Sequence, residues 1–109
     1  MTSNPFNTSE KYKLKETVKY AEGSVVSKIL RKNEAGNITL FAFDKNQNLS
    51  EHTAPFDAIV QVLEGTAKII IAGNEYILHE GEIIIMPADV PHAVEAETAF
   101  KMMLIMLKK

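Results

Sequence analysis

Short apolar segments separated by turn-forming residues constrain the fold of this chain more than any other feature. Residues 58–63, 67–71 and 83–86 are rich in Ile and Val, and Gly, Pro or Asn stands near their ends. Segments of this kind are typical of β-strands. No segment of ten or more residues combines helical periodicity with freedom from Gly and Pro, although residues 9–20 leave room for a turn or two of helix. Many short strands at regular spacing predict an all-β sandwich or barrel.

The turn signals divide the chain into a series of predicted strands. These cover residues 25–31, 38–44, 58–63, 67–71, 75–78, 83–86, 93–96 and 100–107. Residues 11–15 alternate Lys with Tyr and Leu, which predicts a half-exposed edge strand protected by its lysines. Residues 45–50 are predicted to form a polar loop. Gly73 and Asn74, which both accept positive φ, are predicted to connect a hairpin.

Size and charge limit the function classes. With 109 residues and a net charge of -2, the chain is expected to be one domain that binds neither nucleic acid nor a membrane surface. The absence of cysteine excludes disulfides, thiol catalysis and thiolate metal ligands. The longest apolar run, residues 102–107, is far shorter than the ~20 residues of a transmembrane helix. Because residues 1–12 also lack the pattern of a signal peptide, a cytoplasmic protein is expected. Residues 1–9 are predicted to be a flexible arm before a domain at residues 10–109.

The last predicted strand is apolar on both faces. Phe100, Met102 and Leu104 lie on one face, and Met103 and Ile105 lie on the other. A strand of this kind needs cover on both sides. We interpret the pattern as the interface of a two-fold homodimer, with burial under a loop of the same chain as the alternative.

Two histidines stand at the ends of turn-rich stretches. His52 begins HTAPFDAIVQVLEG, and His92 ends GEIIIMPADVPH. The stretches resemble the paired motifs of the cupin superfamily of small jelly-roll barrels, in which His52 matches the first histidine of the first motif. Gly81, Pro87 and His92 match the second motif. The resemblance spans residues 50–94 and implies a single-domain cupin barrel in which both histidines face one interior cavity.

The resemblance also implies an incomplete metal site. Metal-binding cupins use two histidines and a carboxylate or third histidine from the first motif, and one histidine from the second. Here the second histidine position is Ala54 and the acidic position is Ala58. His52 and His92 therefore remain as metal ligands, for a divalent Zn, Ni, Fe or Mn ion that they would hold weakly.

Further side chains are candidates for the same cavity. The aromatic and methionine residues expected to line the pocket are Phe41, Phe43, Phe56 and Met86. Asp57 adjoins the vacant ligand position, but strand alternation places it on the opposite face from Ala58, which favours a turn-capping role. His79 beside Glu80 and Gly81 is expected to be a surface residue.

Three functions are compatible with these residues. In the first, the barrel binds a small organic molecule, with or without a divalent metal on His52 and His92. In the second, the same histidines are catalytic: one imidazole, which ionises near neutral pH, acts as acid or base in a metal-free isomerase. In the third, the protein is a non-catalytic module that binds or senses a metabolite.

Overall fold

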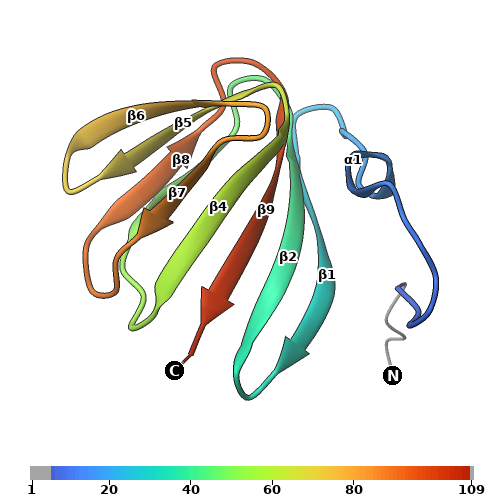
Figure 1. Cartoon of the computed structure of the whole chain (residues 1–109). Helices are drawn as coiled ribbons and strands as arrows, with labels where there is room; N and C mark the ends of the chain where they lie inside the picture. Colours follow the sequence, from blue (N-terminus) through green and yellow to red (C-terminus); the bar gives the residue numbers. More distant parts are fainter. Residues whose placement is uncertain (1–5, 109) are drawn as a thin grey trace.

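The computed structural model describes residues 6–108, which form two antiparallel β-sheets packed face to face (Figure 1). In chain order the elements are α1 (Leu14–Thr17), β1 (Val25–Asn33), β2 (Gly36–Phe43), β3 (Asn48–His52), β4 (Asp57–Glu64), β5 (Thr66–Ile71), β6 (Asn74–His79), β7 (Ile83–Met86), β8 (His92–Glu95) and β9 (Phe100–Leu107). One sheet has the order β1-β2-β9-β4-β7 and the other has the order β3-β8-β5-β6. This arrangement confirms the predicted all-β class.

The predicted strand pattern agrees with the structure except at one strand. The bounds of β7 and β9 are those expected, and most other strands differ by one or two residues at their ends. The exception is β3, since residues 45–50 were predicted to be a loop. Leu49 is the one apolar side chain in this short and mostly exposed strand, so the sequence carries almost no alternation there. The hairpin between β5 and β6 turns at Ala72 and Gly73, both with positive φ, one residue earlier than predicted.

Strand alternation builds the core between the two sheets. On β4, Ala58, Val60 and Val62 are buried, whereas Asp57, Ile59 and Gln61 between them face the other side. Phe43 of β2 and Phe100 of β9 are fully buried, and their rings stack with centroids 4.6 Å apart and an interplanar angle of 8°. Stacked aromatic pairs of this kind dominate the packing of a small core.

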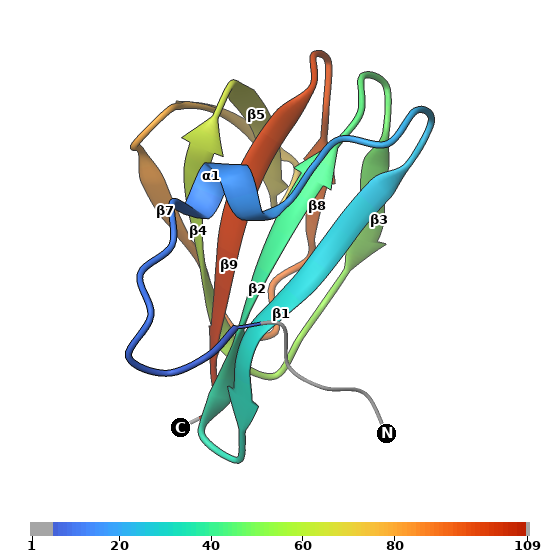
Figure 2. The same ribbon diagram turned by 90° about the vertical axis from the view of Figure 1, so that its right-hand side faces the viewer.

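The N-terminal segment covers part of the outer face of the five-stranded sheet (Figure 2). Phe6 and Val18 are buried there against Leu40 and Ala42 of β2. The edge strand predicted for residues 11–15 is wrong: the chain has no strand there and forms the short helix α1 from Leu14. The apolar side chains of this segment pack onto the face of the sheet instead of extending its edge, and tertiary burial overrides the local alternation. Of the predicted arm, residues 1–5 lie outside the described residues.

The doubly apolar strand β9 is central, between β2 and β4. Its inner side chains, including Met102, belong to the core. On its outer face Met103 packs against the cluster around Phe6 and Val18, as the alternative interpretation expected, whereas Leu107 is exposed. The homodimer therefore stays a prediction. No helix within residues 6–108 has the length and apolarity that a membrane crossing requires.

Candidate functional site

His52 and His92 lie directly opposite each other on neighbouring antiparallel strands. His52 ends β3, His92 begins β8, and their Cα atoms are partners in the ladder. The ring centroids are 4.4 Å apart with an interplanar angle of 65°, an edge-to-face contact. Both rings can therefore contact the same small molecule or ion.

An irregularity in β3 produces this pairing. Leu49 pairs with Val94 and His52 pairs with His92, so three steps along β3 oppose two steps along β8. The extra residue is a β-bulge, a feature that redirects side chains and is common beside active sites. Because directly opposed residues share a face, the bulge places His52 on the same inward face as Leu49 and His92. Without it, Glu51 would stand opposite His92.

Backbone carbonyl groups fix the orientation of both imidazoles. Nδ1 of His52 lies 2.7 Å from the carbonyl oxygen of Ser50, and Nδ1 of His92 lies 3.2 Å from that of Val90. A carbonyl oxygen only accepts, so Nδ1 of each ring carries the proton and donates it. In the neutral tautomer Nε2 then presents a lone pair, which is the arrangement of histidines that bind metals or accept a hydrogen bond from a ligand.

The two rings differ in their exposure. His92 is 5% exposed, and its partner on the adjacent strand β5 is the buried Ile71. His52 at the end of the edge strand β3 is exposed. Sequence reasoning did not identify Ile71 as a neighbour, because strand pairing between β5 and β8 leaves no local signal. The site therefore has one buried ring, that of His92, and one ring that is open to solvent, that of His52.

The loop before His92 is hydrogen-bonded to the loop after His52 and to the first residue of β4. The amide of Asp89 donates to the carbonyl oxygen of Ala54 at 2.8 Å, and the amide of Ala88 donates to Oδ1 of Asp57 at 2.9 Å. Asp57 therefore caps the loop before His92 and not its own turn. Asp89 has a φ of 63°, a left-handed conformation that Asp tolerates better than most residues.

The donor set fits a divalent metal only in part. Two imidazoles that each place a nitrogen about 2.1 Å from one ion have ring centroids roughly 4.6 Å apart at a 90° ligand angle and roughly 5.3 Å apart at a tetrahedral angle. The observed 4.4 Å is slightly below the smaller of these separations. Within the described residues, however, no three His, Cys, Asp or Glu side chains gather where they could hold a metal ion. A tightly held resident metal therefore does not fit, and His52 and His92 alone would hold an ion weakly.

The predicted pocket residues divide into two groups. Phe43 and Met86 are buried and belong to the core between the sheets. Phe41 is half-buried, with its ring 5.9 Å from that of Phe43. Phe56 is also half-buried, and the ammonium group of Lys108 lies 5.8 Å from its ring centroid. Phe41 and Phe56 thus have accessible surface for a ligand, whereas Phe43 and Met86 have almost none.

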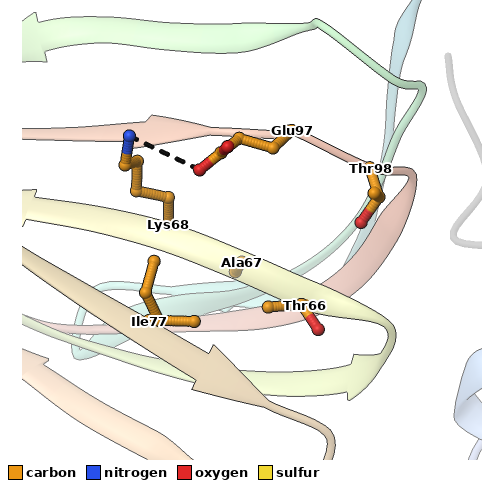
Figure 3. Close-up of a pocket in the computed structure, with 6 residues that line it drawn as sticks. All are labelled: Thr66, Ala67, Lys68, Ile77, Glu97 and Thr98. Atoms are coloured by element: carbon orange, nitrogen blue, oxygen red, sulfur yellow. Dashed lines mark ion pairs between the residues drawn. The ribbon is translucent and has the colours of Figure 1, made fainter.

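A pocket of about 300 Å³ lies elsewhere and involves neither histidine of the pair (Figure 3). Its lining includes Lys68, which forms ion pairs with Glu75, Glu95 and Glu97 at 3.4–3.7 Å. These carboxylates, Glu75 most strongly, raise the pKa of Lys68. Since the lysine already has three partners, we interpret the cluster as structural. His79 is exposed and lies 3.4 Å from the Thr66 hydroxyl, as expected for a surface residue.

Comparisons with known proteins agree with the geometry. Residues 39–108 match the family described as "Cupin domain". A conserved protein of unknown function from Streptococcus pyogenes is 34% identical, with a TM-score of 0.91 over 98% of this chain and 93% of that one. A cupin superfamily protein from Desulfitobacterium hafniense is 25% identical, with a TM-score of 0.90 over 98% and 97% of the two chains.

A third similar structure is a cupin 2 conserved barrel domain protein from Leptotrichia buccalis. It is 44% identical, with a TM-score of 0.87 over 89% of this chain. This chain spans about half the length of that protein, 47%. No curated protein matches the chain.

Proposed function

Since the chain belongs to the cupin family, we propose that His52 and His92 form its ligand site and bind one small organic molecule with one or two polar groups. The observation that carries the proposal is the pairing of the two rings, 4.4 Å apart, with each Nδ1 held by a backbone carbonyl. Among the described residues none hydrogen-bonds to either Nε2 atom. Two preoriented acceptors beside an apolar wall suit a hydroxyl-bearing ligand.

A divalent metal is a weak participant in this proposal. If an ion binds, His52 and His92 hold it, and it supplies Lewis acidity toward an oxygen of the ligand. The protein's own residues orient the ligand in either case: His92 from the buried wall, next to Ile71, and His52 from the open side. Proton transfer between a ligand carbon and an imidazole is the second candidate, because Nε2 of each ring is the free base of its tautomer.

Imidazole nitrogen shifts test the site directly. Long-range ¹H–¹⁵N correlation spectra report each of the three histidines while Ni²⁺, small hydroxy acids and small sugars are titrated one at a time. A compound that binds as proposed shifts the Nε2 signals of His52 and His92 and leaves His79 unchanged. Shifts at His79 alone, or at no histidine with any compound, would contradict the proposal.

Alanine variants give the energetic test. A ligand present at 100 times its Kd stabilises the folded state by about 2.7 kcal/mol, which a thermal-shift assay detects. We expect His52→Ala and His92→Ala each to weaken such a ligand about tenfold or more, the loss of ~1.4 kcal/mol. His79→Ala is the matched control and should bind as the wild type does. Incubation of any hit in D₂O separates binding from proton transfer, since only the latter incorporates deuterium at a carbon atom of the ligand.

A further inference from the structure

Strand β6 is the outermost strand of the four-stranded sheet, at the edge opposite to β3 and its histidine (Figure 1). All six of its residues pair with β5, without a register shift. The amide of His79 donates to Oε1 of Glu82 at 2.7 Å and therefore points away from β5. In an antiparallel pair every second residue directs its N–H and C=O groups to the same side. Glu75 and Ile77 thus also present their backbone groups outward.

The other three sheet edges carry features that discourage pairing with a further strand. β1 has a register shift between Ile29 and Arg31, and its last three residues include Arg31 and Lys32. β3 also has a register shift, and β7 is only 4 residues long. Bulges, exposed basic side chains and short length protect sheet edges in natural proteins. β6 is regular, contains neither Lys nor Pro, and has Glu75 as its one acidic residue.

A groove follows this edge between β6 and β7. It has a volume of about 410 Å³, and its lining includes Tyr76, Ile77 and Ile84. Tyr76 is 42% exposed and Ile77 is 49% exposed. Because they are consecutive in a strand, they lie on opposite faces of it. A strand added to β6 would place alternate side chains on these two faces and cover both apolar residues while its backbone pairs with β6.

Carboxylates lie toward both ends of the groove. Glu75 stands near the start of β6 and Glu82 follows its end, and both line the groove. Residues 69–100, which include this region, contain 6 acidic residues and no Lys or Arg. Lys68, just before this range, already forms ion pairs with Glu75 and with two further carboxylates. The charge of the groove therefore favours a partner with positive side chains.

We propose that β6 and its groove bind an extended basic segment of a protein partner, which adds a strand to the four-stranded sheet. The backbone of the segment pairs with Glu75 and Ile77. Its aliphatic side chains cover Tyr76 and Ile77, and two basic side chains four positions apart lie beside Glu75 and Glu82. Residues four positions apart on a strand share a face and are about 13 Å apart, the same length as from Glu75 to the end of β6.

Two other occupants match the edge less well. The sequence outside the described residues, MTSNP and Lys109, holds no stretch of this pattern. A second copy of β6 would bring its own Glu75, Glu80 and Glu82 against the same carboxylates, and like charges oppose that contact. The charge of this edge thus distinguishes a basic partner from a second copy.

A short peptide tests the proposal on the full chain. The probe is the fluorescein-labelled amide of Thr-Lys-Val-Ile-Val-Lys-Thr, whose Kd is measured by fluorescence anisotropy. We expect it to bind and to slow hydrogen exchange at the amides of Glu75 and Ile77, as followed by NMR. A peptide with Glu in place of both Lys should bind more weakly by about tenfold or more, the size expected of two exposed ion pairs.

Ile77→Lys is the decisive variant, since a side chain 49% exposed tolerates lysine and the new charge repels the basic peptide. The matched control is Ile29→Lys on the edge strand β1, where Ile29 is 48% exposed; it should leave binding unchanged. Glu75→Gln keeps the apolar pattern of β6 and should also weaken binding, so the test does not depend on the folding of one variant.

Four outcomes would overturn the proposal. They are no binding of the basic peptide, equal affinity for the basic and acidic peptides, undiminished affinity in both Ile77→Lys and Glu75→Gln, and bound peptide without slower exchange at Glu75 and Ile77. Slow exchange of these two amides that increases with protein concentration in the absence of peptide would also overturn it, because it would assign the edge to a second copy of the chain.

Discussion

Leu49 and His52 are three positions apart on β3, yet both stand opposite inward-facing residues of β8, Val94 and His92. In a regular strand only residues an even number apart share a face. The extra residue of the bulge explains why these two residues share a face, since Ser50 and Glu51 together oppose the single residue Ala93. The histidine pair thus depends on backbone register as much as on the two residue types.

Deletion of Glu51 is the first prediction. Removing the bulge leaves Leu49 and His52 two positions apart, so His52 stays opposite His92 in a regular ladder. We expect contacts between the two rings to persist in nuclear Overhauser spectra. An alanine inserted after Ser50 serves as the comparator: it adds a second unpaired residue, and the ring contacts should disappear. Loss of the contacts in the deletion variant would contradict the bulge assignment.

The second prediction concerns the missing metal ligands. Ala54→His combined with Ala58→Glu restores the donor set that the cupin resemblance assigns to these positions. Ala58 is buried, so the new carboxylate should destabilise the metal-free protein by about 1–3 kcal/mol or more. A divalent ion should recover this loss and remain bound through gel filtration, as elemental analysis would show.

The control for this gain of function is the same double variant with His52→Ala. It keeps the buried carboxylate and removes a ligand from β3, so it should retain far less metal. Equal retention in both proteins would mean that the two alanine positions do not share a site with the histidine pair.

The third prediction separates core from pocket. Phe43 is fully buried and stacks on Phe100, so Phe43→Ala should lower the free energy of unfolding by about 3–5 kcal/mol. Phe41 is half-buried, and Phe41→Ala should cost less stability while weakening any ligand that uses this wall. Urea unfolding of the two variants gives the comparison. A smaller loss for Phe43→Ala than for Phe41→Ala would be inconsistent with the packing described.

The sequence predicted the fold class, most strand positions and the two histidines that the structure brings together. Alternation of apolar side chains carried that information, as in β7 and β9. It failed at β3, whose single inward apolar residue, Leu49, gives no periodic signal. It also failed at residues 11–15, where a strand-like alternation forms part of a segment buried against the sheet. Neither the bulge nor the burial of Phe43 and Met86 can be read from local pattern, because both depend on the partner strands.

The fourth prediction is a pH effect at Tyr20. Burial, and then the hydrogen bond and charge of Glu64, raise the pKa of Tyr20 above its usual 10.0. The folded protein therefore keeps this proton more tightly than the unfolded chain does. The resulting stabilisation is complete below pH 10 and is lost as the pH rises from there through the folded-state pKa.

Urea unfolding between pH 8 and pH 11 measures this linkage, with Tyr20→Phe as the comparison. The wild type should lose more stability above pH 10 than the variant, which has no proton to release at this position. Parallel curves for the two proteins would contradict the raised pKa. The ammonium group of Lys101 lies 4.9 Å from the Tyr20 ring centroid. Because both proteins contain Lys101, its own titration affects both unfolding curves and is not the source of a difference between them.

The bond from Asp89 to Ala54 ties the loop before His92 to the loop after His52, and the bond from Ala88 to Asp57 ties it to the start of β4. Because the ring of His52 is exposed, a ligand can reach the pair without moving this loop. The two bonds therefore stiffen the chain that leads into the buried His92 and do not control entry to the site. Loss of either bond should raise amide hydrogen exchange across residues 87–91.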